Sequence, residues 1–185
     1  MTASSCGLVP VMELLIDKGA DPCSRNDRGF MPIHFAAETG RVEATRYLLD
    51  RGVDVNSKGP NLWTPLMTAA LNGNLSILEL LLDRGADITC RHAEGYTALH
   101  YAANRNYIEI AELLIDRGSD IDSKTVSSRT PLMVAVEGGH IAVAKVLLEK
   151  RADPRCVSKD GTTAFYMAKN ANNLRLMKCI SRYLK

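Results

Sequence analysis

Five aspartates recur at a fixed interval, and carboxylates repeated in this way are a residue type that could coordinate a metal ion. The interval is 33 residues, and the aspartates are Asp21, Asp54, Asp87, Asp120 and Asp153. Equal positions in successive copies of a stacked repeat lie about 10 Å apart, the spacing of neighbouring helices, so one ion cannot bridge two of them. We therefore predict no metal site, and we expect the aspartates to accept hydrogen bonds from loop N–H groups.

The four histidines could act in acid–base catalysis, but none stands at a meaningful spacing from a nucleophile or a carboxylate. His34 and His100 occupy one slot of the 33-residue frame, and His140 follows a glycine. His92 falls at a predicted loop tip, where we expect it to be free to contact a partner. The chain also lacks the glycine-rich motifs that bind phosphate. We predict no enzyme activity, no cofactor and no small-molecule substrate.

The five cysteines form an odd-numbered set without a Cys-x-x-Cys pair. Cys90 and Cys156 share a slot in which other copies have serine, which favours a small packing residue over a metal ligand. Reduced thiols are typical of the cell interior, so we expect a cytoplasmic protein, with the nucleus as a second location. No segment approaches the roughly 20 apolar residues that a membrane span needs.

A glycine frame organises the elements that must position these side chains. Gly7, Gly40, Gly73 and Gly139 share one register of 33 residues, in which Asn106 takes the place between the last two glycines. A short supersecondary unit buries its apolar face only against its neighbours, so a fixed period of this length indicates a stacked array.

One copy, residues 58–90, shows how the local structure arises. Thr64 can cap a helix with its hydroxyl, and Pro65 suits the first helical position, where its missing N–H costs nothing. The pattern predicts a first helix over 65–72 that ends at Gly73 and a second helix over 75–84 that ends at Gly85. An extended, hairpin-like connection then leads to the next threonine.

These residues carry a family resemblance. The pattern Gly-x-Thr-Pro-Leu-x-x-Ala-Ala-x-x-Gly followed by Leu-Leu-x-x-Gly-Ala-Asp closely resembles the ankyrin repeat, most fully at residues 95–103 and 114–118. The resemblance implies an all-α ankyrin-repeat solenoid and covers 1–185 as a single domain. The expected copies are an incomplete repeat at 1–24, full repeats at 25–57, 58–90, 91–123 and 124–156, and a C-terminal capping repeat at 157–185.

The resemblance also assigns roles to single residues. It implies that His34 and His100 are structural and bond loop backbone between repeats. The stretch from Leu48 to Asn56 resembles the pattern that asparaginyl hydroxylases modify in ankyrin repeats, so Asn56 is a candidate modification site, although the same slot is ordinarily structural.

Several copies depart from the pattern. Met31 replaces the capping threonine, which should weaken the start of that helix by about 1 kcal/mol. Leu62 and Ser128 replace a turn glycine, so we expect those two tips to adopt a different turn. The last copy lacks the closing Gly-Ala-Asp, which suits a polar terminal cap. The chain begins midway through a first helix, leaving one helix over about 9–18, as if cut from a longer array or started at an internal methionine.

The surface that could bind a partner follows from positions that the stack does not need. In ankyrin-like proteins partners usually meet the hairpin tips and the exposed side of the first helices, which line a concave face. The slot before the capping residue holds aromatics in three copies and then an arginine, residue types enriched at interface hot spots. The candidate contact residues are Phe30, Phe35, Trp63, Tyr96, Tyr101, Arg129, Arg28, Arg91, His92 and Arg105. The alternative is that these rings only pack on neighbouring hairpins.

We therefore predict a protein-interaction module, monomeric on its own, that binds a protein or peptide partner. The alternative is a substrate-recognition or regulatory segment of a larger protein, such as a ubiquitin-ligase adaptor, an enzyme or a channel. The distribution of charge suggests a third hypothesis. Residues 151–185 hold eight basic and two acidic residues, whereas residues 1–150 hold 15 basic and 19 acidic residues. That basic end could bind nucleic acid or an anionic membrane, but we favour a solubilising cap and expect no nucleic-acid partner.

Overall fold

The computed structural model describes residues 1–184. The chain forms two compact units, residues 1–93 (unit 1) and residues 94–185 (unit 2), and each unit is described by itself. All regular elements in the described residues are helical, and no strand occurs among them. The predicted all-α class is confirmed.

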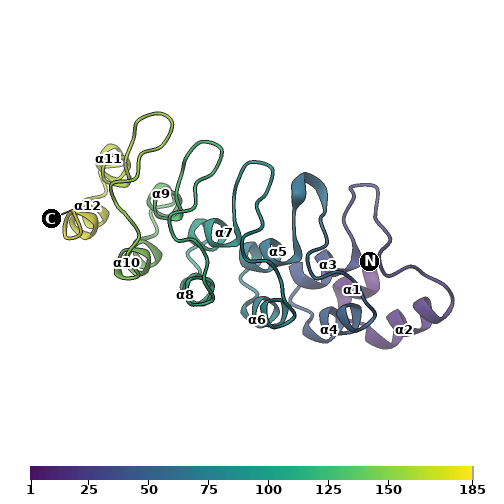
Figure 1. Ribbon diagram of the computed structural model, residues 1–185. Helices are drawn as coiled ribbons and strands as arrows, with labels where there is room; N and C mark the ends of the chain where they lie inside the picture. Colours follow the sequence, from purple (N-terminus) through teal and green to yellow (C-terminus); the bar gives the residue numbers. More distant parts are fainter. Residues whose placement is uncertain (185) are drawn as a thin grey trace. The chain divides into compact units, whose positions relative to one another are not determined.

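Unit 1 consists of two rows of helices (Figure 1). The first row stacks α1 (Thr2–Cys6) on α3 (Pro32–Glu38) and α3 on α5 (Pro65–Asn72). The second row stacks α2 (Val9–Asp17) on α4 (Val42–Asp50) and α4 on α6 (Leu75–Asp83). A short 3-10 helix, η1 (Pro60–Leu62), lies in the loop before α5. The loops that precede α3 and α5 project from the same side of this unit.

Unit 2 repeats the arrangement with six helices in the described residues. Its first row contains α7 (Ala98–Asn104), α9 (Pro131–Glu137) and α11 (Ala164–Asn170). Its second row contains α8 (Ile108–Asp116), α10 (Ile141–Glu149) and α12 (Leu174–Ser181). In both units the first helices approach closely because their paired small residues are fully buried, as Ala69–Ala70 and Ala102–Ala103 show.

The helix boundaries follow the local signals closely. Helix α5 spans 65–72 as predicted, and α6 ends at Asp83, one residue before the predicted end. The Thr64 hydroxyl accepts the Met67 N–H at 3.3 Å, which is the predicted cap. The N-terminal expectation of one remaining helix was wrong: residues 2–6 also form a helix, because buried Ala3 and Ser4 pack it against α3.

The left-handed positions confirm one prediction and correct another. Gly40, Gly73 and Asn106 end their helices at φ 70°, 76° and 59°, as a C-terminal cap requires. The expectation of a different turn was wrong at Ser128, which keeps the left-handed backbone of Gly29 and Gly95, at φ 59°, and the same bond to the carbonyl three residues before it. It was right at Leu62, whose loop forms the 3-10 helix η1 and has a second left-handed residue, Asn61, at φ 52°. The loop geometry therefore overrides the residue's own preference.

Candidate functional site

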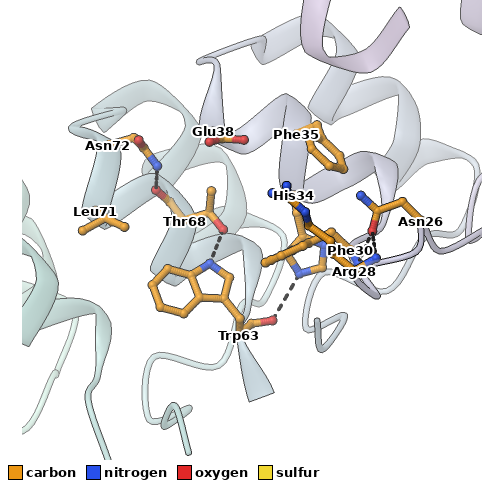
Figure 2. A pocket seen from close by; sticks show the side chains of 10 residues that line it. All are labelled: Asn26, Arg28, Phe30, His34, Phe35, Glu38, Trp63, Thr68, Leu71 and Asn72. Atoms are coloured by element: carbon orange, nitrogen blue, oxygen red, sulfur yellow. Dashed lines mark hydrogen bonds between the residues drawn. The ribbon is translucent and has the colours of Figure 1, made fainter. Parts of the chain in front are cut away.

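A pocket of about 300 Å³ lies in unit 1, between the loops that precede α3 and α5 and the outer sides of these helices. Its apolar lining consists of Phe30, Phe35, Trp63 and Leu71. Its polar lining consists of Asn26, Arg28, His34, Glu38, Thr68 and Asn72. Figure 2 shows these side chains together, with the Trp63 and Phe35 rings contributed by different copies of the repeat.

The Trp63 ring is fixed on two sides. Its indole Nε1–H donates to Thr68 Oγ1 at 2.7 Å (Figure 2). That hydroxyl donates in turn to the Thr64 carbonyl at 3.1 Å. The His92 ring packs edge-on against the indole, with 5.4 Å between ring centroids. The indole is half-buried, so one part of it remains at the surface of the pocket.

Phe30 is held by its own loop and by two neighbouring rings. Asn26 Oδ1 accepts the N–H groups of Arg28 and Phe30 at 3.0 and 2.9 Å, which closes the turn before the ring. The Phe30 ring then meets His34 and Phe35 edge-on, at centroid distances of 5.6 and 6.3 Å. The apolar lining is therefore preformed rather than assembled from mobile side chains.

His34 links the two loops beneath the pocket. Its Nδ1 accepts the Met31 N–H at 3.3 Å, so the proton lies on Nε2, which donates to the Trp63 carbonyl at 3.1 Å. Burial lowers the pKa of His34 below its usual value of 6.5, because the desolvated ring resists a charge. The same bond to Met31 N–H helps to start α3, where the threonine cap is missing.

Unit 2 carries a separate patch of aromatic and charged side chains. The Tyr96 and Tyr101 rings stack with 5.6 Å between centroids, and Tyr96 also meets His100 edge-on at 5.5 Å. Burial raises the pKa of the Tyr101 hydroxyl well above its usual value, with a smaller contribution from Tyr96. Arg129 forms an ion pair with Glu137, and its carbonyl accepts from His100 Nε2 at 3.0 Å.

Comparison with known proteins identifies the family. A family model described as ankyrin repeats in three copies matches residues 1–92 and 90–158. The chain belongs to the ankyrin-repeat family. The fold is therefore that of an ankyrin solenoid. Ankyrin repeats are generally protein–protein interaction modules and are typically non-catalytic. A comparison with curated proteins found no match.

No helix in the part of the chain that the structure describes is long and apolar enough to cross a membrane. The boundaries that we assign to the individual repeats stay a prediction.

The predicted contact residues lie in two places, the pocket in unit 1 and the aromatic patch in unit 2. Phe30, Phe35, Trp63 and Arg28 line the pocket in unit 1. His92 is not the isolated side chain that we expected, since its ring contacts Trp63. Tyr96, Tyr101 and Arg129 form the patch in unit 2, where Arg105 is exposed at the end of α7. Arg91 is exposed on the loop beside Trp63. Whether these residues bind a partner stays a prediction.

Asn26 and Leu71 are members of the pocket to which sequence reasoning did not point. Asn26 had a readable signal, because an asparagine three residues before a turn glycine can close the turn with its side chain. Leu71 had none, since a leucine on a short helix is expected to face the core.

The structural roles that we predicted for the aspartates and histidines are confirmed. Each repeated aspartate accepts the backbone N–H two residues further on, at 2.8–3.1 Å. No group of three potential ligands that could hold a metal ion occurs among residues 1–184. His34 and His100 reach carbonyls of the following copy, as the ankyrin resemblance implied.

Asn56 also has a structural role, because its Oδ1 accepts the Asp87 N–H at 2.7 Å. Its modification stays a prediction, which intact-mass analysis of the protein from its own cells checks. An unmodified mass would contradict it.

The side chains that directly precede the second helices also join successive ankyrin copies, which the sequence analysis did not predict for this position as a whole. Asn74 Nδ2 donates to the carbonyls of Ala37 and Glu38 at 2.7 and 2.9 Å, and His140 Nε2 reaches the Asn104 carbonyl at 2.9 Å. Arg41 Nε donates to the Ser5 carbonyl at 3.1 Å. In these three copies the side chain satisfies open carbonyls at the end of the preceding first helix.

Proposed function

We propose that this ankyrin chain binds a protein or peptide partner through the pocket in unit 1. The pocket carries this proposal, because three half-buried aromatic rings are held open to the surface by bonds that do not involve a partner. Rigid aromatic side chains supply a large contact area at little entropic cost. Phe30, Phe35 and Trp63 are the residues that we expect to carry the affinity.

The size and charge of the pocket suggest what enters it. A volume of about 300 Å³ accommodates one large apolar side chain and leaves a peptide backbone at the surface. The rim carries Arg28 and Glu38, both exposed and of opposite sign. A rim of mixed sign suits a protein segment better than a uniformly charged polyanion.

The patch in unit 2 supports a second, independent contact. Tyr96 and Tyr101 are half-buried and stacked, and Arg129 is oriented by Glu137. We propose that these residues, together with Arg91, His92 and Arg105, are further contacts for the partner and contribute less affinity than the pocket.

The test uses the single tryptophan of the chain, Trp63, as a reporter of the pocket. Random dodecapeptides displayed on phage are selected on the 185-residue chain, and the selected peptides are synthesised and titrated while Trp63 emission is recorded. We expect peptides with a large apolar residue to shift the emission saturably. If no selected peptide perturbs Trp63 emission, the pocket is not the binding site.

Variants then locate the affinity by calorimetry. Trp63→Ala should weaken peptide binding by more than about 2 kcal/mol, as expected for a central aromatic anchor. Tyr96→Ala should weaken binding less, and Tyr166→Ala, an exposed aromatic outside the proposed contacts, should have no effect. Circular dichroism confirms that each variant is folded. Equal affinities for Trp63→Ala and the unaltered chain would refute the proposal.

A further inference from the structure

Three aromatic rings line the pocket in unit 1, those of Phe30, Phe35 and Trp63. The planes of the Phe30 and Phe35 rings differ by 69°, with 6.3 Å between centroids, and Trp63 comes from the next loop (Figure 2). All three residues are half-buried, so part of each ring stays open to the pocket. The face of an aromatic ring is negative and attracts a cation within about 6 Å of its centroid. Rings that lie in different planes can therefore surround a cation.

A carboxylate lies beside these rings. Glu38 follows Phe35 by three residues on α3, so both side chains share one side of the helix, and both line the pocket. In the part of the chain that the structure describes, the exposed Glu38 carboxylate forms no ion pair. It can therefore attract a cation that enters the pocket. His34 adds no repulsion, because burial lowers its pKa and keeps the ring neutral at pH 7.

Arg28 also lines the pocket, and its charge opposes that of Glu38. An unmodified ammonium group is compact and strongly hydrated, so it gains little from a half-buried pocket whose rim has no net charge. Methyl groups on the nitrogen change this balance, because they contact the rings while the positive charge is kept. A pocket of about 300 Å³ has room for such a group and for the methylene chain that carries it.

We propose that the side chain that enters the pocket is a lysine methylated on its ammonium group. Phe30, Phe35 and Trp63 contact the methyl groups, and the Glu38 carboxylate balances the charge. This inference rests on the proposed function and names the residue of the partner that the pocket selects. The methylene chain of the lysine supplies apolar surface against the remaining lining, including Leu71.

The first experiment separates charge from shape with two small probes. Choline carries a trimethylated ammonium, and its neutral analogue has carbon in place of the charged nitrogen. Both are titrated into the 185-residue chain while Trp63 emission is recorded. We expect choline to bind about tenfold more tightly than the neutral analogue. Equal binding of the two probes, or no effect of choline, would show that the pocket does not select a cation.

Charge variants then identify the groups that set this preference. Glu38→Gln keeps the size of the side chain and should remove most of the preference for choline, whereas Arg28→Gln should tighten choline binding by about threefold. Glu43→Gln is the matched control, because Glu43 is exposed on α4 and does not line the pocket. It should bind choline like the unaltered chain. Effects of opposite sign for Glu38→Gln and Arg28→Gln would indicate a pocket for an anion and overturn the inference.

Peptides test whether the methylated ammonium belongs to a protein segment. A selected dodecapeptide that depends on Trp63 is resynthesised with trimethyllysine or with lysine at its apolar anchor position. The trimethyllysine peptide should bind about tenfold more tightly than the lysine peptide, and more tightly than choline. If the two peptides bind equally, or neither binds better than choline, the inference is wrong while the pocket still binds its selected peptides. If no selected peptide depends on Trp63, the proposed function itself fails.

Discussion

At the scale of single residues, His34 is a buried base whose neutral form is part of the fold. Its Nδ1 accepts a backbone N–H, so protonation would break that bond as well as place a charge in a buried position. Its pKa lies below the usual value of 6.5, which means that the unfolded chain takes up the proton more readily. The stability that His34 contributes is therefore present above pH 6.5 and is lost as the pH falls through its lowered pKa.

We expect His34→Ala to destabilise the chain by about 2 kcal/mol at pH 7.5, because two hydrogen bonds are lost. The same variant should show a flatter loss of stability between pH 7 and 5 than the unaltered chain. Urea unfolding followed by circular dichroism at several pH values measures both effects. Parallel pH profiles for the two proteins would contradict the assignment.

At two exposed positions with a left-handed backbone, Gly85 and Arg151, a substitution changes the free energy of unfolding through the backbone alone and not through packing. A Cβ added at Gly85 would meet no atom within 4 Å, so Gly85→Ala should cost about 1 kcal/mol through its backbone alone. Arg151 stands in the equivalent slot of a later copy at φ 73° and is exposed. Arg151→Gly should therefore stabilise the chain by roughly 0.5–1 kcal/mol. Thermal unfolding of both variants checks the pair, and a loss of stability in Arg151→Gly would exclude the strain.

At the scale of the elements, the ends of three first helices, α1, α3 and α7, are closed by a side chain from the following copy. Asn74 donates both of its bonds to the end of α3, and these carbonyls have no partner within the helix. Asn74→Ala should cost about 1–2 kcal/mol. Asn74→Asp keeps the size but removes the donor, so it should cost at least as much. Chemical unfolding of the two variants measures this, and a neutral effect of Asn74→Asp would show that the amide is dispensable.

The elements were largely predictable from local signals, whereas the pocket was not. Thr64, Pro65 and Gly73 set the limits of α5 because caps and left-handed turns depend on residues close in sequence. The pocket combines Phe35 with Trp63 and Leu71 from different copies, and its shape depends on rotamers set by Thr68, His34 and His92. Ser128 was misjudged for a related reason. Its conformation is held by hydrogen bonds within its loop, from the Ser128 N–H to the Thr125 carbonyl and from the Thr125 N–H to the Arg129 carbonyl, which outweigh the preference of the residue itself.

At the scale of the whole molecule, charge is divided unevenly along the chain. The last second helix, α12, exposes Arg175 and Lys178 and is followed directly by the exposed Arg182, whereas its counterparts in earlier copies end in aspartate or glutamate. The cap is not uniformly polar as we expected, because Leu174 is 68% exposed.

Despite this basic helix, we expect the chain to pass through a heparin column at about 0.15 M salt, since exposed single charges are largely screened there. Retention that falls steeply with added salt, and that disappears in Arg175→Glu/Lys178→Glu, would support a nucleic-acid or anionic-membrane partner instead.

The bonds that close the ends of the first helices run in one direction, whereas His34 and His100 bond forward to the copy that follows them. Arg41, Asn74 and His140 each close the first helix of the copy before them, so the loss of a later copy leaves an earlier helix end open. Within each unit, fraying should therefore pass from later copies to earlier ones more readily than the reverse. Hydrogen exchange should show this asymmetry in the order in which the first helices lose protection. A partner held at the loops of one copy would then stabilise the copy before it without touching it.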